Sequence, residues 1–461
     1  MFRRYHIPAA PAPSRRPWAR VDVHRDLSRC LNCGTCIDSC LYGVHDRGIA
    51  DARTMEEPES HLCRVCFRCV QECPVGALSL EQNAEYVEAG NGLFKPEILR
   101  TLAGEADGGR IPVTGACYRG PWGGQGFDGM WTDMSEIVRP TRDGIHGREY
   151  ISTSVDIGAR PTYLDLRRGG PWNPPREIPI PILLDAASPG TPPLGVLAAV
   201  ATAARTLETY SILPAASARE IGEDILGRAI LRLEDGAATG FEKAAGVELT
   251  YRAEDGADLG SLRRALPHAI LSLRVPLPAY RREAVDLALD AGADLIHFTA
   301  DWRDVDTIDG VNRYIRTLRE LHGHLVDLSR RDAVTVLASG PIAAAEHVPK
   351  TIILGADLVA ADLALYVAME CVPPNHALHL GRFPGEFPLT DADWAAQRVV
   401  NLMNAWRDQL LEILGAMGMR EVRRLRGEMG RAIFQEEAER EAFGDIRVRA
   451  PSKEPKEVTA R

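Results

Sequence analysis

The sequence is short of several features, and each absence excludes a class of protein. It has no run of about 18 apolar residues, so no transmembrane helix is expected. It has no excess of basic residues, and its formal net charge of -10 argues against a nucleic-acid partner. Two arginines stand near the start, but no apolar segment follows them, so they do not form an export signal.

Cysteines are few but concentrated. Eight of the ten lie in two copies of the spacing C-x2-C-x2-C-x3-C, "CLNCGTCIDSC" at 30–40 and "CRVCFRCVQEC" at 63–73. Disulfides suit small secreted domains, and a tetrahedral zinc site needs fewer thiols than each copy supplies. Three thiolates at this spacing can wrap three corners of an iron-sulfur cube, and a fourth comes from elsewhere. Iron-sulfur clusters are therefore favoured, with zinc and disulfides as the alternatives.

The expected ligand sets cross between the two copies. In two-cluster ferredoxins the last cysteine of each run ligates the other cluster. One 4Fe-4S cluster is then held by Cys30, Cys33, Cys36 and Cys73, and the second by Cys40, Cys63, Cys66 and Cys69. Residues 21–82 resemble a bacterial-type two-cluster ferredoxin domain, which a flexible arm, 1–20, precedes. Oxygen-sensitive clusters imply a reducing, cytoplasmic location.

The rest of the chain divides by pattern. Residues 108–129 are glycine-rich without the strand and helix that flank a phosphate loop, and residues 83–175 as a whole are predicted to link the domains and wrap the next one. From 176 to 390, short apolar runs alternate with amphipathic stretches such as "VNRYIRTLRELHGHL". This alternation predicts an α/β fold with a parallel sheet, and the number of units over about 200 residues favours a closed, TIM-like (β/α)8 barrel.

The carboxyl-terminal part is predicted to be helical. In residues 391–446, an apolar stripe on a long first helix should pack on the barrel, and "GEMGRAIFQEEAEREAF" should form a second helix. The stripe contains Val399, Met403, Trp406, Leu410, Ile413 and Met417. Residues 447–461 are expected to be disordered.

The order of these parts resembles a known family. A two-cluster module, a linker and a barrel with "RDAVTVLASGPIAAAEHVPKTIILGADLVAADLAL" look like the flavin-binding synthase domain of glutamate synthases, in the short archaeal-type arrangement. The resemblance covers roughly Cys30 to Gly444. It implies a barrel that binds FMN, receives electrons and reduces an imine formed from 2-oxoglutarate and ammonia. The sequence contains no amino-terminal cysteine amidotransferase domain, so glutamine hydrolysis is not expected.

Two strand-end residues depart from the pattern of that family. Arg232 and Arg274 stand where the family has lysines. The positive charge is kept, but a rigid guanidinium fork replaces a point charge. Both are candidate catalytic residues, because they could stabilise negative charge that develops on a flavin or a substrate.

The phosphate-binding positions depart further. The resemblance makes Ser339, Gly340 and Gly355 the candidate cofactor-binding residues. In such barrels the phosphate sits on backbone amides after strands seven and eight. Pro341 follows directly where the family has a glycine, and it has no amide hydrogen to donate. Asp362 stands where the family has a threonine, and its carboxylate would repel a phosphate.

For the remaining candidate residues, a structural role is an alternative to a functional one. His297 and Asp301, near the end of a predicted strand, could form an acid/base pair or simply satisfy polar groups at the barrel rim. The two cysteines outside the ferredoxin module, Cys117 and Cys371, are expected to be buried small apolar residues rather than ligands.

Two functions follow. In the first, electrons pass through two 4Fe-4S clusters toward a barrel site with FMN as candidate cofactor, and a 2-oxo acid, an imino acid or another small molecule accepts them. In the second, the barrel has lost its chemistry and the chain is a flavin-free relay or scaffold subunit. Both require a redox partner protein or a larger electron-transfer complex.

Overall fold

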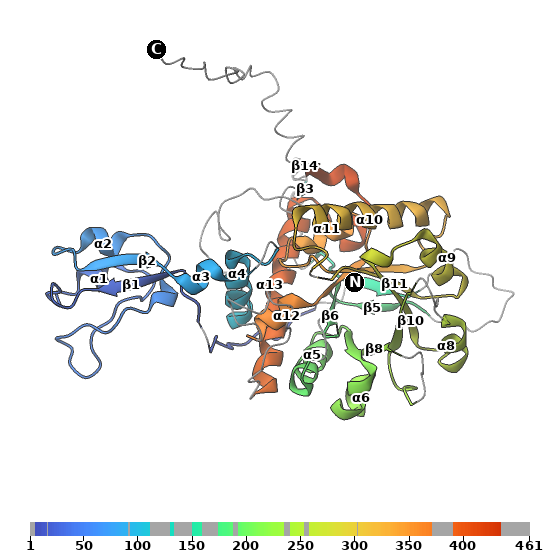
Figure 1. Ribbon diagram of the computed structural model, residues 1–461, viewed down its shortest axis with the longest axis horizontal. Helices are drawn as coiled ribbons and strands as arrows, with labels where there is room; N and C mark the ends of the chain where they lie inside the picture. The colour runs from blue at the N-terminus through green and yellow to red at the C-terminus, as the bar shows by residue number, and fades with distance from the viewer. Residues whose placement is uncertain are drawn as a thin grey trace, which may run out of the picture.

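The computed structural model describes most of the chain. The described residues are 5–15, 17–90, 93–110, 130–132, 150–158, 174–187, 192–234, 240–252, 258–301, 303–370 and 391–434. They form a small amino-terminal lobe that projects from a larger barrel (Figure 1). Within these ranges, no helix combines the length and apolar composition needed to cross a membrane.

The small lobe contains a two-stranded sheet and two short helices. Strand β1 (Val21–Arg25) pairs antiparallel with β2 (Leu78–Gln82), while α1 (Thr35–Ser39) packs against α2 (Arg68–Glu72). Buried apolar side chains from both strands form a small core with partly buried cysteines from both cysteine runs. So little apolar surface gives limited stability, which is typical of small domains that depend on metal clusters.

The barrel is closed and all its strands are parallel, which confirms the predicted TIM-like fold. Its core consists of Val, Ile, Leu and Ala side chains that are almost fully buried, as parallel strands covered on both faces require. In chain order, the strands are β6 (Ile182–Asp185), β7 (Ser211–Pro214), β8 (Ala229–Leu233), β9 (Gly246–Thr250), β10 (Ile270–Pro276), β11 (Leu295–Thr299), β12 (Thr335–Ser339) and β13 (Leu358–Ala361).

Helices surround the barrel, as Figure 1 shows. The long helix α10 begins where the Thr307 side chain accepts a hydrogen bond from the Gly310 amide, and its buried residues recur along one face. The surrounding helices are α5 (Leu194–Thr206), α6 (Ala215–Ile221), α7 (Glu223–Leu226), α8 (Leu259–Ala265), α9 (Arg282–Asp290), α10 (Ile308–Asp327), α11 (His347–Ile353) and α12 (Leu363–Ala368).

Three further helices join the lobe to the barrel. The chain leaves the lobe through α3 (Ala84–Glu88) and α4 (Pro96–Gly108), and α4 packs against the long helix α13 (Ala392–Ala416). Helix α13 also packs on α5 of the barrel, and Trp406 in its apolar stripe is buried. Fully buried Arg398 on α13 donates to backbone carbonyls of α4 and α12, which ties the joint together.

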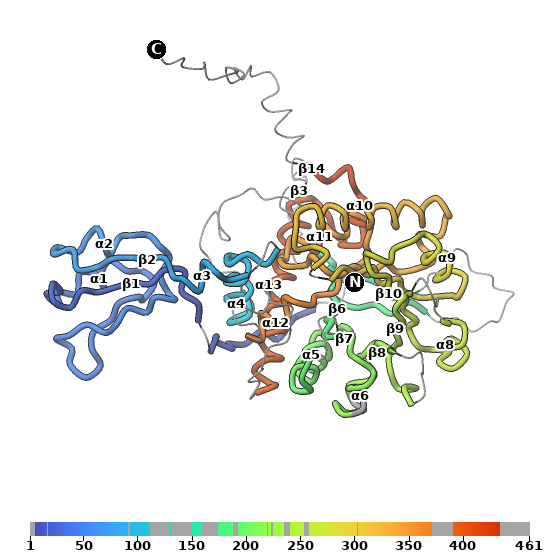
Figure 2. Tube along the Cα trace, viewed as in Figure 1, coloured from blue at the N-terminus to red at the C-terminus, as the bar shows by residue number. Residues whose placement is uncertain are grey.

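The amino-terminal arm and the second carboxyl-terminal helix differ from the predictions. Residues 5–15 lie along α13, where the backbone of Ala10 exchanges two hydrogen bonds with the Asn401 side chain (Figure 2). This part of the arm is therefore docked rather than flexible. The predicted second helix begins instead with a 3-10 turn and the strand β14 (Ala432–Phe434), and its remainder lies outside the described residues.

Two short antiparallel pairs connect the segments around the barrel. Strand β14 pairs with β3 (Met130–Thr132), and β4 (Val155–Ile157) pairs with β5 (Arg176–Ile178). Most of the linker that runs from α4 to β5 in the sequence lies outside the described residues.

Candidate functional site

The two cysteine runs form loops of the same shape. In the first run the backbone is left-handed at Asn32 and Gly34, with φ of 52° and 83°. At the equivalent positions of the second run, Val65 and Phe67 both have φ of 59°. A left-handed conformation strains a β-branched or bulky residue, and such strain persists only where other interactions require it. The same loop is thus formed in both copies, although the second copy has unfavourable residues for it.

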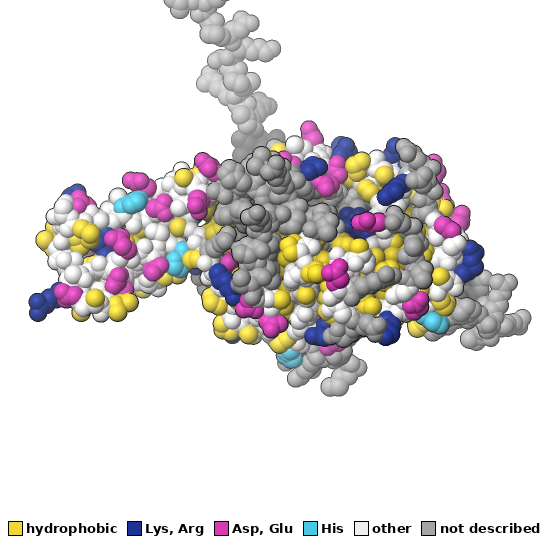
Figure 3. Space-filling view, turned by 60° about the horizontal axis from the view of Figure 1, so that its bottom comes forward, with side chains coloured by type: hydrophobic (Ala, Val, Ile, Leu, Met, Phe, Trp, Pro, Cys, Tyr) yellow, Lys and Arg dark blue, Asp and Glu magenta, His cyan; other side chains and the backbone are white. Residues whose placement is uncertain are grey.

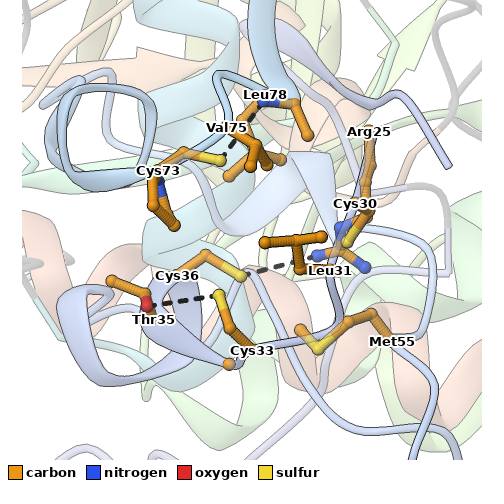
Figure 4. Close-up of a pocket in the computed structure, with 13 residues that line it drawn as sticks. Arg25, Cys30, Leu31, Cys33, Thr35, Cys36, Met55, Cys73, Val75 and Leu78 are labelled. Atoms are coloured by element: carbon orange, nitrogen blue, oxygen red, sulfur yellow. Dashed lines mark hydrogen bonds between the residues drawn. The ribbon is translucent and has the colours of Figure 1, made fainter. Parts of the chain in front are cut away.

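Each set of four predicted ligands surrounds one cavity. The eight thiols are free, and they converge in two groups that each draw one cysteine from the other run. The Cys36 site is the cavity lined by Cys30, Cys33, Cys36 and Cys73 (Figure 4). The Cys69 site is the cavity lined by Cys40, Cys63, Cys66 and Cys69.

The residues present fit two 4Fe-4S clusters. Each cavity offers four thiols, which is the number that one cube needs. The two sites are also alike in size, with about 340 Å³ and 320 Å³ of space between the lining atoms and the solvent at the mouth. One cysteine of each set, Cys33 and Cys66, is exposed to solvent.

Several donors point at the sulfur atoms of the Cys36 site. The Arg25 guanidinium donates to Cys36 Sγ at 3.9 Å, and the Ala77 amide donates to Cys73 Sγ at 3.2 Å. The Thr35 hydroxyl lies 3.3 Å from Cys33 Sγ (Figure 4). This hydroxyl contact is the main reason that the pKa of the Cys33 thiol lies below its usual value. The surroundings of this exposed ligand therefore favour the thiolate that a cluster requires.

Buried contacts hold Arg25 in place. Arg25 is 9% exposed, and its guanidinium lies 3.1 Å from Nδ1 of His45 and donates to the Glu56 carbonyl. Burial, together with the Arg25 charge, lowers the pKa of His45 to about 4. His45 is therefore neutral at pH 7 and accepts through Nδ1. The arginine is fixed in a charged state next to the cluster cavity.

The Cys69 site is more apolar. Burial raises the pKa of Cys69 to about 11 and also raises the pKa of Cys63. Within the described part of the chain, the hydrogen bonds to sulfur atoms of this site come from backbone amides alone, from Val65 to Cys63 at 3.4 Å and from Val70 to Cys69. The two sites thus share a ligand set but differ in their polar surroundings.

Charged and polar side chains fill the carboxyl-terminal end of the barrel. Glu248 on β9 is fully buried and accepts from His297 Nδ1 at 2.8 Å. His297 Nε2 contacts the Ser339 hydroxyl at 2.8 Å, and that hydroxyl donates to Thr299. Arg274 donates to Thr299 and lies 3.7 Å from Glu248, which closes a ring of five side chains. Both ring nitrogens of His297 are thus engaged within the ring.

Both candidate catalytic arginines are bound to carboxylates in this region. Arg232 contacts Asp185 at 3.1 Å and Glu248 at 3.2 Å, and Arg274 contacts Asp185 at 3.2 Å. Burial acts to raise the pKa of Glu248, but His297 and the arginines outweigh it and hold the pKa below its usual value. The structure thus brings Arg232, Arg274 and His297 together around the carboxylates of Asp185 and Glu248.

The structure does not bring Asp301 to His297. Both ring nitrogens of His297 are engaged by Glu248 and Ser339, as described above. Asp301 is exposed, and its carboxylate accepts from the Arg303 amide in a turn after β11. The predicted acid/base pair is therefore not formed, because the buried strand end points the histidine inward while the next turn points the aspartate toward solvent.

The described residues do not fit an FMN phosphate after strands seven and eight. The Ile342 amide donates to the Gly340 carbonyl and the Ala343 amide donates to His347, so neither is available. After β13, the Leu363 amide donates to the Asp362 carboxylate at 2.6 Å. Pro341 supplies no amide hydrogen. The chain's own groups thus occupy three backbone amides after β12 and β13.

The three predicted cofactor-binding residues lie in different places. Gly340 is at the carboxyl end of β12 with φ of 124°, as predicted, but the Ser339 side chain points into the barrel ring. Gly355 precedes β13 and therefore lies at the amino end of the barrel, where its carbonyl accepts from Arg331. It is at the wrong face for a phosphate that binds at the carboxyl ends of the strands. Cys117 and Cys371 lie outside the described residues.

Two protein-family models match the chain. The model described as "4Fe-4S dicluster domain" matches residues 22–85, and "Conserved region in glutamate synthase" matches residues 313–420. Together with the fold, they define an iron-sulfur protein in which a two-cluster domain is joined to a glutamate synthase-like (β/α)8 barrel.

Known relatives confirm the resemblance over most of the chain. "Archaeal-type glutamate synthase [NADPH]" of Dehalococcoides mccartyi is 25% identical over 483 aligned residues, which cover 88% of this chain and 93% of that protein. One subunit of the ferredoxin:CoB-CoM heterodisulfide reductase of Methanosarcina mazei is 36% identical over 61 residues, which cover 11% of this chain and 38% of that protein. A solved structure of a flavocytochrome b2 mutant has a TM-score of 0.44 and 11% identity, covering 81% of this chain and 89% of that chain.

Sequence reasoning did not find Arg25, His45 or Glu248. Arg25 and His45 lie outside the cysteine runs and meet only in the folded lobe. Glu248 lies in "GVELT", a strand that was not predicted, because a glutamate inside a short apolar run weakens the strand pattern. The one signal in the sequence that could have revealed Glu248 is its position, as a charged residue, within an otherwise apolar run.

Proposed function

We propose that this protein is an iron-sulfur electron-transfer subunit of an oxidoreductase, and that it moves electrons through two 4Fe-4S clusters. The observation that supports this most strongly is the convergence of eight thiols on two cavities of similar size. Such clusters are sensitive to oxygen, so the protein would work in a reducing cytoplasm.

The chain's own residues hold and insulate the clusters. When bound, each cluster supplies one-electron redox chemistry. The thiolates of Cys30, Cys33, Cys36 and Cys73 would hold one, and those of Cys40, Cys63, Cys66 and Cys69 the other. Leu78 and Leu80 of β2 line the Cys36 site and the Cys69 site respectively, and their apolar side chains would exclude water from the inner side of each cluster.

The surface of the lobe favours a protein partner. Leu31 lines the Cys36 site and is 65% exposed, while Tyr42 and Phe67 line the Cys69 site and are 44% and 48% exposed. Apolar side chains reach the surface of the lobe in Figure 3. Exposed apolar groups beside a redox site are typical of a protein docking surface. The similarity of the lobe to part of a heterodisulfide reductase supports a place in a larger electron-transfer complex.

A second candidate function is an FMN-dependent glutamate synthase reaction in the barrel. The relatives named archaeal-type glutamate synthase support it, since they align over 88% of the chain. Arg232, Arg274 and His297 would then lie next to the substrate, with Gly340 at the phosphate position. The occupied amides after β12 and β13 oppose it, as does the Asp362 carboxylate.

Electron uptake and product formation separate the two functions. Reconstituted anaerobic protein should be reduced by dithionite, give reduced 4Fe-4S signals in electron paramagnetic resonance (EPR), and pass its electrons to a one-electron acceptor dye. With reduced methyl viologen, 2-oxoglutarate and ammonia, it should form no glutamate. Glutamate formation that depends on added FMN would establish the second function instead, and failure to show cluster signals would remove the first.

A further inference from the structure

The hydrogen bonds around the two cluster sites are unequal. At the Cys36 site, Arg25, Thr35 and the Ala77 amide contact three different sulfur atoms. At the Cys69 site, the contacts of this kind within the described ranges come from backbone amides, and no side chain adds to them.

Hydrogen bonds and positive charge at the sulfur atoms change the reduction potential of a cluster. Reduction adds one electron, and therefore one negative charge, to the cluster and its thiolates. A donor that contacts a sulfur stabilises this added charge, and a charged donor does so most strongly. Burial in apolar surroundings has the opposite effect, because it disfavours the more highly charged form.

We infer that the two clusters of this lobe differ in reduction potential, that the cluster at the Cys36 site has the higher one, and that Arg25 is the residue chiefly responsible. This inference rests on the proposed two-cluster function. Arg25 stands five residues before the first cysteine of its run, and the same position of the second run is Pro58, which has no donor group. The two copies thus share their ligand spacing but not this arginine.

Two other arginines lie near the Cys69 site, and their positive charges would raise the potential of the cluster there and so reduce the difference. Arg64 is exposed, so solvent screens its charge. Arg100 on α4 acts on Cys63 through its charge, without a hydrogen bond to the sulfur atom. The buried Arg25 is in direct hydrogen-bond contact with Cys36 and is fixed there by His45. A fixed charge in direct contact outweighs charges that are screened or more distant.

The two cluster sites lie at different distances from the barrel. The action of Arg100 on Cys63 puts the Cys69 site next to α4, the helix that packs on α13. Arg25 pairs with Leu78, whereas Val21 at the other end of β1 pairs with Gln82, just before α3, so Arg25 and the Cys36 site lie at the end of the sheet away from α3 and α4. A single electron on the lobe would therefore reside mainly on the outer cluster, at the Cys36 site.

A redox titration followed by EPR tests the inference on the full chain. The native protein should show two midpoint potentials. Arg25→Gln should move the higher midpoint to a more negative potential, so that the two approach each other, and should leave the lower midpoint in place. Thr35→Val, which removes one uncharged donor, should move the same midpoint by a smaller amount. A single midpoint in the native protein, or movement of the lower midpoint alone, would overturn the inference.

Matched controls keep the test decisive. Arg29→Gln removes an exposed arginine of the same lobe whose guanidinium donates to the Val75 carbonyl and to no sulfur, and it should leave both midpoints in place. Arg25→Lys retains the charge and should restore most of the native separation. Iron content measured on each variant separates a lost cluster from a shifted one. If native protein holds no clusters, the proposed function fails; if it holds two with equal midpoints, only this inference fails.

Discussion

The lobe and the barrel treat their reactive side chains in opposite ways. In the lobe, eight thiols face two cavities from strained loops, and they converge on those cavities rather than on one another's partners. In the barrel, the ionisable groups contact one another: Asp185 and Glu248 bind both arginines, and Glu248 also binds His297. Convergent groups around a cavity indicate a ligand, whereas a closed ring of matched charges indicates a site that needs none for its stability.

Removing one cluster ligand should have the largest effect. Cys69→Ser should lose about half of the bound iron, because the cube at the Cys69 site loses one of its four thiolates. The barrel should keep its unfolding transition. Iron and sulfide assays with circular dichroism would measure both. The matched control is Cys117→Ser, which should retain all the iron; equal loss from both variants would contradict the ligand assignment.

Breaking the barrel ring should destabilise the barrel alone. Glu248→Gln keeps the size of the side chain but leaves two buried arginines and His297 with one carboxylate. Removing one partner of a buried ion pair costs roughly 3–5 kcal/mol. Chemical denaturation should show this loss, while the cluster absorbance of the native state stays unchanged. Glu283→Gln, at an exposed glutamate, should change the unfolding free energy little.

Asp362 should make the barrel less stable as the pH rises. Burial and the nearby charge of Asp185 raise the pKa of Asp362 from 3.8 to about 7. Between these values the folded state binds more protons than the unfolded state, so the free energy of unfolding falls as pH increases from about 4 to 7. Asp362→Asn should flatten this slope and add roughly 1–4 kcal/mol at pH 8. An unchanged slope in denaturation series across pH would contradict the assignment.

Restoring the family's residues at the phosphate position of the barrel should strengthen FMN binding, which is the smallest of the expected effects. The double variant Pro341→Gly with Asp362→Thr adds an amide donor and removes a carboxylate from the region after β12 and β13. One hydrogen bond to a charged group is worth about 1.5–3 kcal/mol, so FMN binding should strengthen about tenfold or more. Quenching of FMN fluorescence would measure it. Native protein that already binds FMN tightly, with no gain in the variant, would contradict the account of the barrel.

The sequence predicted the parts that depend on local spacing. Cysteine spacing, together with the exchange of the last cysteine between runs that is typical of two-cluster ferredoxins, grouped the eight thiols in the same way as the two cavities do. The barrel followed from alternating patterns, but β9 and its Glu248 were missed, since a buried charge is stabilised only by partners from other strands. The arm was predicted to be flexible from its prolines, whereas Asn401, almost 400 residues away in the chain, holds it through two hydrogen bonds. Tertiary contacts of this kind leave no local signal.

One composition measurement tests the central claim most directly. Protein purified without oxygen and then soaked with FMN should be assayed for iron, acid-labile sulfide, zinc and flavin. Two cluster sites and a closed barrel should give about eight irons and eight sulfides per chain, with no flavin retained. One FMN per chain beside the iron would contradict the closed barrel, and two zinc ions without sulfide would contradict the electron-transfer lobe.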